Sequence, residues 1–199
     1  GVQMQLAPKL SADITGFYRK TSNLIGIVIA EGYLRSGDVV KAQRYPIFDN
    51  INFATVKGVE FSLTRRMSDN FTGFLNYTFS QALVSSSLLF SQPQDLARTF
   101  PADWDQSHVL SFGATMAFPS QWGFSLMGGI SSGFPYTFNV LQPNAERSPT
   151  INSLDAMVFK EKTFFKMTTR LYAQVSNLLN RKNVWWVYAD SGQPGVDTN

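Results

Sequence analysis

The fold is decided by two alternating segments joined by a tight turn: Val109-Leu110-Ser111-Phe112-Gly113-Ala114-Thr115-Met116-Ala117-Phe118, then Pro119-Ser120-Gln121, then Trp122-Gly123-Phe124-Ser125-Leu126-Met127-Gly128-Gly129-Ile130-Ser131. In both segments, apolar side chains recur at every second position, and mostly small or polar ones stand between them. Successive side chains of a β-strand point to opposite faces of the sheet. The stretch therefore predicts a β-hairpin with one apolar face and one more polar face.

The same alternation recurs along the chain, at residues 10–19, 59–64, 71–80, 154–159 and 167–176, with a further stub at residues 1–6. The segment at 154–159 is the shortest and weakest. Strands of a soluble sandwich usually run for about 5–6 residues, whereas a tilted transmembrane strand needs about 9–11. Several segments here reach the longer value, which favours a barrel wall over a sandwich.

The connections between these segments alternate between short and long. Short ones lie at residues 67–70, 119–121 and 160–166, and long ones at 21–51, 81–106, 134–152 and from 178 onward. Bacterial outer-membrane barrels have this arrangement, with short periplasmic turns and long extracellular loops. The sequence therefore predicts an all-β, antiparallel, up-and-down transmembrane β-barrel, of which this chain supplies about seven to eight strands.

Composition agrees with a wall that meets lipid on one side and water on the other. Of the 199 residues, 44% are hydrophobic, 14% aromatic and only 16% charged, against about 25% charged in average soluble domains. The longest apolar run, residues 24–30, is far shorter than the roughly 20 residues of a transmembrane helix. The net charge of +3 is scattered along the chain, which argues against a nucleic-acid partner. With no cysteine, disulfides, Cys–metal sites and thiol catalysis are excluded.

Aromatic residues gather at the two ends of the predicted strands. Phe71, Phe118 and Trp122 lie beside short turns. A second group lies near the long connections: Tyr18, Tyr77, Phe79, Phe134, Tyr136, Trp185 and Trp186. Rings with an apolar body and a polar rim form such girdles at both membrane–water interfaces.

Four stretches resemble the barrels of TonB-dependent outer-membrane receptors: Val56 to Phe61, Phe71 to Ala82, Pro101-Ala102-Asp103-Trp104-Asp105-Gln106-Ser107-His108, and Val175-Ser176-Asn177-Leu178-Leu179-Asn180-Arg181-Lys182-Asn183. The resemblance implies a barrel of about 22 strands that holds a plug domain. It also implies a place in the bacterial outer membrane and energy supplied through TonB. On this basis we expect residues 1–199 to be the C-terminal part of such a barrel, with the plug and the last strand outside the chain.

Catalysis, metal binding and a bound cofactor are not expected. His108 is the sole histidine, and Asp105 precedes it by three positions, but a catalytic triad is recognised by geometry rather than by spacing. We expect His108 to form hydrogen bonds at the barrel rim. One histidine without cysteine provides no ligand cluster for a metal. Four charged residues share the polar-face register and are expected in the lumen, as lining of the transport path or as salt bridges to a plug: Asp13, Arg19, Glu60 and Arg66.

The long connections are the expected place of solute contact, because binding residues concentrate on loops. The candidate ligand-binding residues combine aromatic, amide and cationic side chains: Arg98, Trp104, Phe134, Tyr136, Asn139 and Arg147. The expected function is energy-coupled uptake of a large scarce solute, with outer-membrane lipid, a plug and TonB as partners. The solute is left open among siderophores, cobalamin, glycans and peptides.

Three alternatives remain at this point. One is a small self-contained barrel of eight strands with a structural or adhesive role. Another is a barrel enzyme that uses His108. The last is a soluble β-sandwich that serves as a binding module, in which the apolar faces would be hidden between two sheets.

Overall fold

The computed structural model describes residues 1–37, 39–68, 70–86, 98–139, 142–188 and 193–196, and these form strands, turns and loops without a helix. Eight strands span the main sheet: β1 (Val2–Ala7), β2 (Leu10–Ser36), β3 (Val39–Ser68), β4 (Phe71–Ser86), β6 (His108–Ala117), β7 (Trp122–Ser131), β10 (Ile151–Phe164) and β11 (Met167–Val175). Five short strands belong to the connections: β5 (Arg98–Pro101), β8 (Pro135–Tyr136), β9 (Glu146–Arg147), β12 (Val184–Val187) and β13 (Pro194–Val196).

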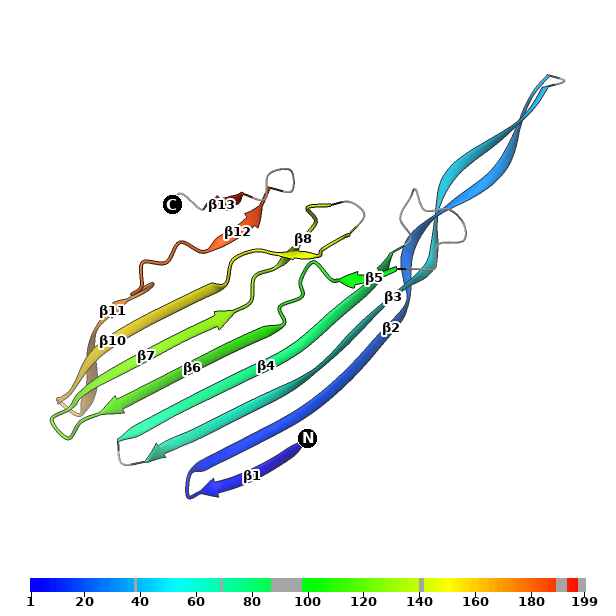
Figure 1. Cartoon of the computed structure of the whole chain (residues 1–199). Coiled ribbons are helices and arrows are strands. Elements are labelled where there is room, and N and C mark those ends of the chain that lie inside the picture. The colour runs from blue at the N-terminus through cyan, green and yellow to red at the C-terminus, as the bar shows by residue number, and fades with distance from the viewer. Residues whose placement is uncertain (38, 69, 87–97, 140–141, 189–192, 197–199) are drawn as a thin grey trace.

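The main sheet is an antiparallel meander. Its order is β1-β2-β3-β4-β6-β7-β10-β11, so each spanning strand pairs with its neighbours along the chain, and β5 joins the long-loop end of β4. Figure 1 shows this single open sheet, with short turns at one end and long connections at the other. The predicted up-and-down antiparallel architecture of a partial barrel is therefore confirmed.

The register places apolar side chains in rows on one face. One row runs Ile14, Phe61, Tyr77, Leu110 and Ile130 across five strands. No second layer of the described residues covers this face, and large side chains on it stay exposed: Phe124 is 41% exposed, Ile130 49% and Leu171 72%. Apolar exposure on this scale marks a surface that contacts lipid or protein. We call this side the apolar face.

The opposite face carries small and polar side chains, and we call it the polar face. Ser62 Oγ donates to Asn76 Oδ1 at 2.7 Å, and the hydroxyls of Thr115 and Ser125 lie 2.9 Å apart. Polar side chains that bond to one another across neighbouring strands are expected on the side of a barrel wall that faces the water-filled lumen.

One glycine on the polar face is required by close packing. A Cβ at Gly123 would overlap the ring of Phe159, the residue directly opposite on β10. That ring is 4% exposed and lies under the Arg170 guanidinium at 4.5 Å. Such pairing of an aromatic ring with a cross-strand glycine is one of the devices that pin sheet register.

The tight turns predicted at residues 67–70 and 119–121 are confirmed, and each holds a residue in the left-handed region. Asn70 and Gln121 both have φ near 66°, a conformation that asparagine tolerates better than most residues do. The link expected at 160–166 is shorter than predicted, because β10 continues to Phe164 and β11 begins at Met167. The weak segment at 154–159 lies inside a strand of 14 residues.

The prediction of a loop at residues 21–51 is wrong. There β2 and β3 continue as a two-stranded ribbon, paired from Leu24–Asn52 to Ser36–Val39. The ribbon extends beyond the sheet, since β3 pairs with β4 only from Ala54 onward (Figure 1). Alternation is imposed where one face meets lipid, and it fades where both faces meet water. The pairing of these residues was therefore not visible in the pattern.

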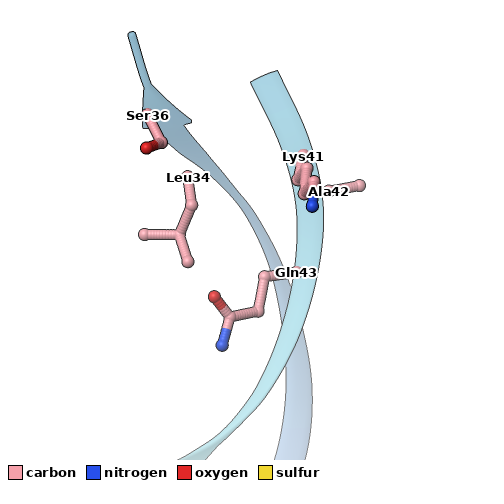
Figure 2. Close-up of a pocket in the computed structure, with 5 residues that line it drawn as sticks. All are labelled: Leu34, Ser36, Lys41, Ala42 and Gln43. Carbon is pink, nitrogen blue, oxygen red and sulfur yellow. The ribbon is translucent and has the colours of Figure 1, made fainter. Parts of the chain in front are cut away.

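Near its tip the ribbon twists and leaves a shallow groove. Leu34, Ser36, Lys41, Ala42 and Gln43 line it (Figure 2). Leu34, one of its lining residues, is 60% exposed, so the groove is open to solvent. Ligand sites of small molecules are concave and largely enclosed, so the groove is not a candidate site.

Candidate functional site

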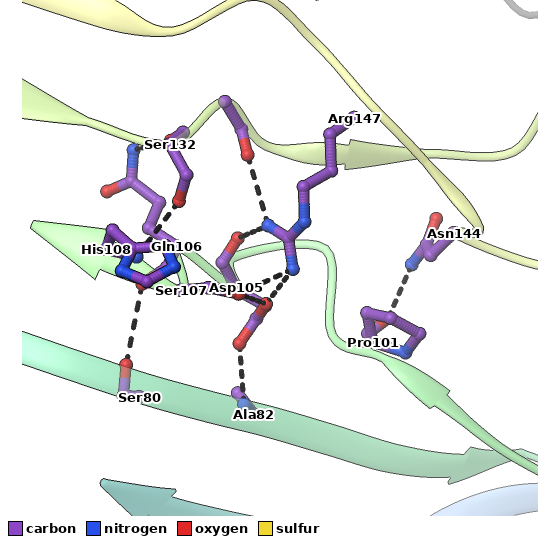
Figure 3. Close-up of polar contacts among 11 residues, drawn as sticks. Ser80, Ala82, Pro101, Asp105, Gln106, Ser107, His108, Ser132, Asn144 and Arg147 are labelled. Atoms are coloured by element: carbon purple, nitrogen blue, oxygen red, sulfur yellow. Dashed lines mark hydrogen bonds and ion pairs between the residues drawn. The ribbon is translucent and has the colours of Figure 1, made fainter. Parts of the chain in front are cut away.

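The long connections meet at the end of the sheet opposite the tight turns. The connection between β4 and β6 and the connection between β7 and β10 lie side by side there and are joined by polar contacts (Figure 3). We call the described part of these two connections, residues 98–107, 132–139 and 142–150, the rim.

Asp105 is the centre of the rim. Its side chain is 1% exposed, and one carboxylate oxygen accepts the backbone N–H of Ala82 at 2.6 Å. The other oxygen accepts the Ser107 hydroxyl at 3.2 Å and an ion pair from Arg147. A buried carboxylate is tolerated only when its oxygens are satisfied in this way.

Arg147, on the short strand β9, joins the two connections. Besides the ion pair to Asp105, one nitrogen donates to the backbone carbonyls of Asp105 and Gly133 at 3.0 and 3.2 Å. The other donates to the Ser107 hydroxyl at 2.9 Å. A guanidinium presents several donors in a fixed fork, so one side chain holds four acceptors in place.

Asn144 forms a second joint between the same connections. It is 7% exposed, and its amide nitrogen donates to the Pro101 carbonyl at 2.8 Å and to Asp103 at 2.6 Å. Its backbone N–H donates to the Thr137 hydroxyl at 3.0 Å. Two independent joints across about forty residues make the rim a rigid platform rather than a pair of separate loops.

His108 lies at the start of β6, below the rim. Its Nδ1 lies 2.8 Å from the Tyr77 hydroxyl, and the Phe79 ring is 5.2 Å from the imidazole. Its backbone N–H donates to the Ser132 hydroxyl at 3.1 Å. The expectation that His108 forms hydrogen bonds at the rim is confirmed. Asp105, the partner that a triad would need, is engaged by Arg147 instead.

The six predicted ligand-binding residues all belong to the rim, but they have different surroundings. Trp104 is 62% exposed beside the buried Asp105, and Asn139 is also exposed. Phe134 and Tyr136 are half-buried near β8, which pairs with the β9 strand that carries Arg147. Arg98 begins β5, paired with Ser86, and its side chain lies outside the described residues.

Sequence reasoning missed the residues that hold the rim together. Asp105 and Gln106 stood in a motif that was recognised, yet their partners lie about 25 to 42 residues away. Gln106 donates to the Ser131 hydroxyl and the Ser132 carbonyl, both at 3.1 Å. In the sequence, these residues are visible only as a cluster of polar side chains around Trp104. Nothing in the sequence indicates that this cluster contacts the connection between β7 and β10.

The last motif, residues 175–183, is docked beside the rim on β10. Asn177 accepts the Arg181 N–H at 2.9 Å and donates its own backbone N–H to Asp155 at 2.8 Å. Asn183 exchanges two hydrogen bonds with the backbone of Asn152, at 3.0 and 2.8 Å. The motif is followed by β12, whose Trp186 contacts the ring of Tyr188 just after the strand, with ring centroids 4.3 Å apart and the planes tilted by 53°.

Metal chemistry finds no support in the part of the chain that the structure describes. No group of three or more His, Asp or Glu side chains lies close enough there to hold an ion. Nor does that part contain a helix of the length and hydropathy that crossing a membrane requires.

An antiparallel wall with one apolar and one polar face, tight turns at one end and a rim of long loops at the other, is the architecture of an outer-membrane β-barrel. The family model described as TonB dependent receptor-like, beta-barrel, matches residues 1–178. The chain belongs to the family of TonB-dependent receptor β-barrels, whose members are receptors and transporters of the outer membrane rather than enzymes. Neither a curated protein nor a solved structure matches the chain significantly.

Proposed function

We propose that this chain forms part of the wall and of the extracellular rim of a receptor in the bacterial outer membrane. The receptor takes up a large, scarce solute, with energy delivered through TonB. Membership of the TonB-dependent receptor family supports this proposal, because intact receptors of the family work with a plug and TonB. The solute class is a siderophore, cobalamin, a glycan or a peptide.

The observation that carries the proposal is the rim with its exposed aromatic side chains. Asn144 donates to the Pro101 carbonyl and to the Asp103 side chain just before Trp104, and the buried Asp105 follows it, so the backbone of Trp104 is held while its side chain is 62% exposed. A rigid aromatic side chain contributes a large contact area at a low entropic cost. Phe138, 57% exposed on the neighbouring connection, adds a second ring.

The polar face supports a transport path along the wall. Asp13, Glu60, Asp155 and Glu161 all fall on it by register, among serine, threonine and asparagine side chains. Charged and polar groups are tolerated in a lumen that holds water and a plug. Among the described residues, the outer edges of β1 and β11 have no strand partner, and hydrocarbon does not allow an unpaired strand edge. We therefore propose that residues 1–199 act as the C-terminal part of a larger closed barrel with its plug.

The test measures uptake by cells that carry the intact receptor. Four labelled probes are supplied one at a time: a ferric hydroxamate, cobalamin, a maltooligosaccharide and an oligopeptide. We expect one probe to accumulate only with the receptor, and a protonophore to abolish its accumulation. Trp104→Ala should weaken binding of that probe by about tenfold, the effect of losing one aromatic anchor. Accumulation that is insensitive to the protonophore, or no receptor-dependent uptake of any probe, would overturn the proposal.

A further inference from the structure

Charges on the membrane-spanning part of the sheet are segregated by sign. Each carboxylate of these strands within the described residues lies on the polar face. The charged residues that the register places on the apolar face are all cations, and they stand at its two margins: Lys20, Lys57, Arg65, Lys160 and Lys162. Solvation alone does not account for this, because a lysine and a glutamate at a membrane margin both reach water.

The tight-turn margin holds the best-defined group of these cations. Lys160 lies directly opposite Trp122 on β7, with its Nζ 4.7 Å from the centre of the indole ring. Lys162 follows two positions later on the same face, opposite Thr169. Glu161, between the two lysines, points to the polar face and is paired there with Arg170 at 2.9 Å, so it is not available to them.

The depth of this group matches the headgroup region. Above Lys160, the apolar-face residues of β10 are Val158, Ala156 and Leu154, which form the hydrocarbon-facing band. Below it come Phe164, 58% exposed, and the turn residue Lys166. Lysines at such a margin extend their stems along apolar surface and place their ammonium groups among the headgroups.

We propose that Trp122, Lys160 and Lys162 form a binding site for the phosphate of an anionic phospholipid in the periplasmic leaflet. The indole holds the Lys160 ammonium by a cation–π contact, and Lys162 lies two strand positions away, about 7 Å along the same face. Two cations on one face, with the nearest carboxylate turned to the other, complement a lipid that carries a net negative charge. The site anchors the wall at a fixed depth and orientation in the inner leaflet.

The experiment compares lipids around the intact receptor in bilayers of phosphatidylcholine that contain a minority of phosphatidylglycerol. Spin-labelled forms of each lipid report how strongly each associates with the protein. The wild type should prefer phosphatidylglycerol. Lys160→Gln and Lys162→Gln should each reduce that preference by about fivefold, which is the change in affinity expected when one lysine near an anionic lipid surface is lost. Lys160→Arg keeps the charge and should retain the preference.

Lys41→Gln is the matched control, because it removes the same charge from the ribbon, away from the bilayer. Each variant is first shown to keep the heat-modifiable gel shift of the folded barrel. Inorganic phosphate, added at the ionic strength of a chloride control, should not displace the lipid. Equal association of both lipids with the wild type, an unchanged preference in Lys160→Gln, or displacement by inorganic phosphate would each overturn the proposal.

Discussion

Replacement of Asp105 by alanine is the perturbation that tests the rim most sharply. The change removes the acceptor of the Ala82 N–H, a group on a residue that is 5% exposed, and the counter-ion of Arg147. Removing one partner of a buried ion pair costs about 3–5 kcal/mol. The side chain of Arg147 is 33% exposed and regains part of its hydration. We therefore expect a cost of about 2–4 kcal/mol, including the unsatisfied buried N–H.

This cost should appear as local opening of the rim, because the paired strands below it keep their own hydrogen bonds. A loss of about 2–4 kcal/mol raises the population of the open form by about 30- to 1000-fold. Hydrogen exchange of the intact receptor should accelerate by that factor in segments 78–86 and 144–150, and remain unchanged in β7.

The control is Asp49→Ala, which removes an exposed carboxylate from the ribbon and should leave exchange in the rim unchanged. If Asp105→Ala exchanged like the wild type in both segments, the rim would not be held by this residue. Acceleration that extended equally into β7 would show that Asp105 supports the whole wall, and the account of a local joint would be refuted.

Three further changes test the wall and the ribbon. Gly123→Ala should destabilise the barrel by about 1–3 kcal/mol, because its Cβ overlaps the buried ring opposite it; Gly16→Ala, whose Cβ meets its nearest atom at 4.0 Å, should be neutral in the same urea titration. Leu126→Arg places a charge in mid-membrane and should cost about 2–4 kcal/mol, whereas Ser125→Arg, one position away on the polar face, should cost far less. Replacing residues 24–51 by a tight turn should leave the folded fraction unchanged on a heat-modifiable gel.

The contrary outcomes are equally definite. Equal stability of the two glycine variants would contradict the aromatic contact, and equal cost of the two arginine variants would contradict the assignment of faces. Loss of folding without the ribbon would show that its pairing supports the spanning strands.

The spanning strands were predictable because lipid imposes a strict period. In β6 and β7, every second side chain must be apolar, and the predicted residues 109–118 and 122–131 agree with the observed strands almost residue for residue. The turn at 119–121 was visible because the alternation stops there. Outside the membrane this constraint disappears, and the ribbon, which pairs without a register shift from Ile25–Asn50 to Ser36–Val39, was not recognised.

The rim was predictable as a place but not as a structure. Loop length indicated where solute-contacting residues belong, and motif resemblance singled out the Asp105 region. The contact between Asp105 and Arg147 depends on two loops that share no periodic signal and lie 42 positions apart. Arg147 was accordingly predicted as a ligand contact, whereas its described bonds hold the rim together; solute binding by it and the other candidates stays a prediction.

The central claim is that one face of this sheet meets hydrocarbon and the other meets water. Residues 1–199 contain no cysteine, so single cysteines can be placed at each residue from 124 to 131 of a cysteine-free intact receptor in its membrane. A water-soluble thiol reagent should label positions 125, 127, 129 and 131 from the lumen, and leave 124, 126, 128 and 130 unlabelled. Uniform labelling, uniform protection or the opposite alternation would contradict the account.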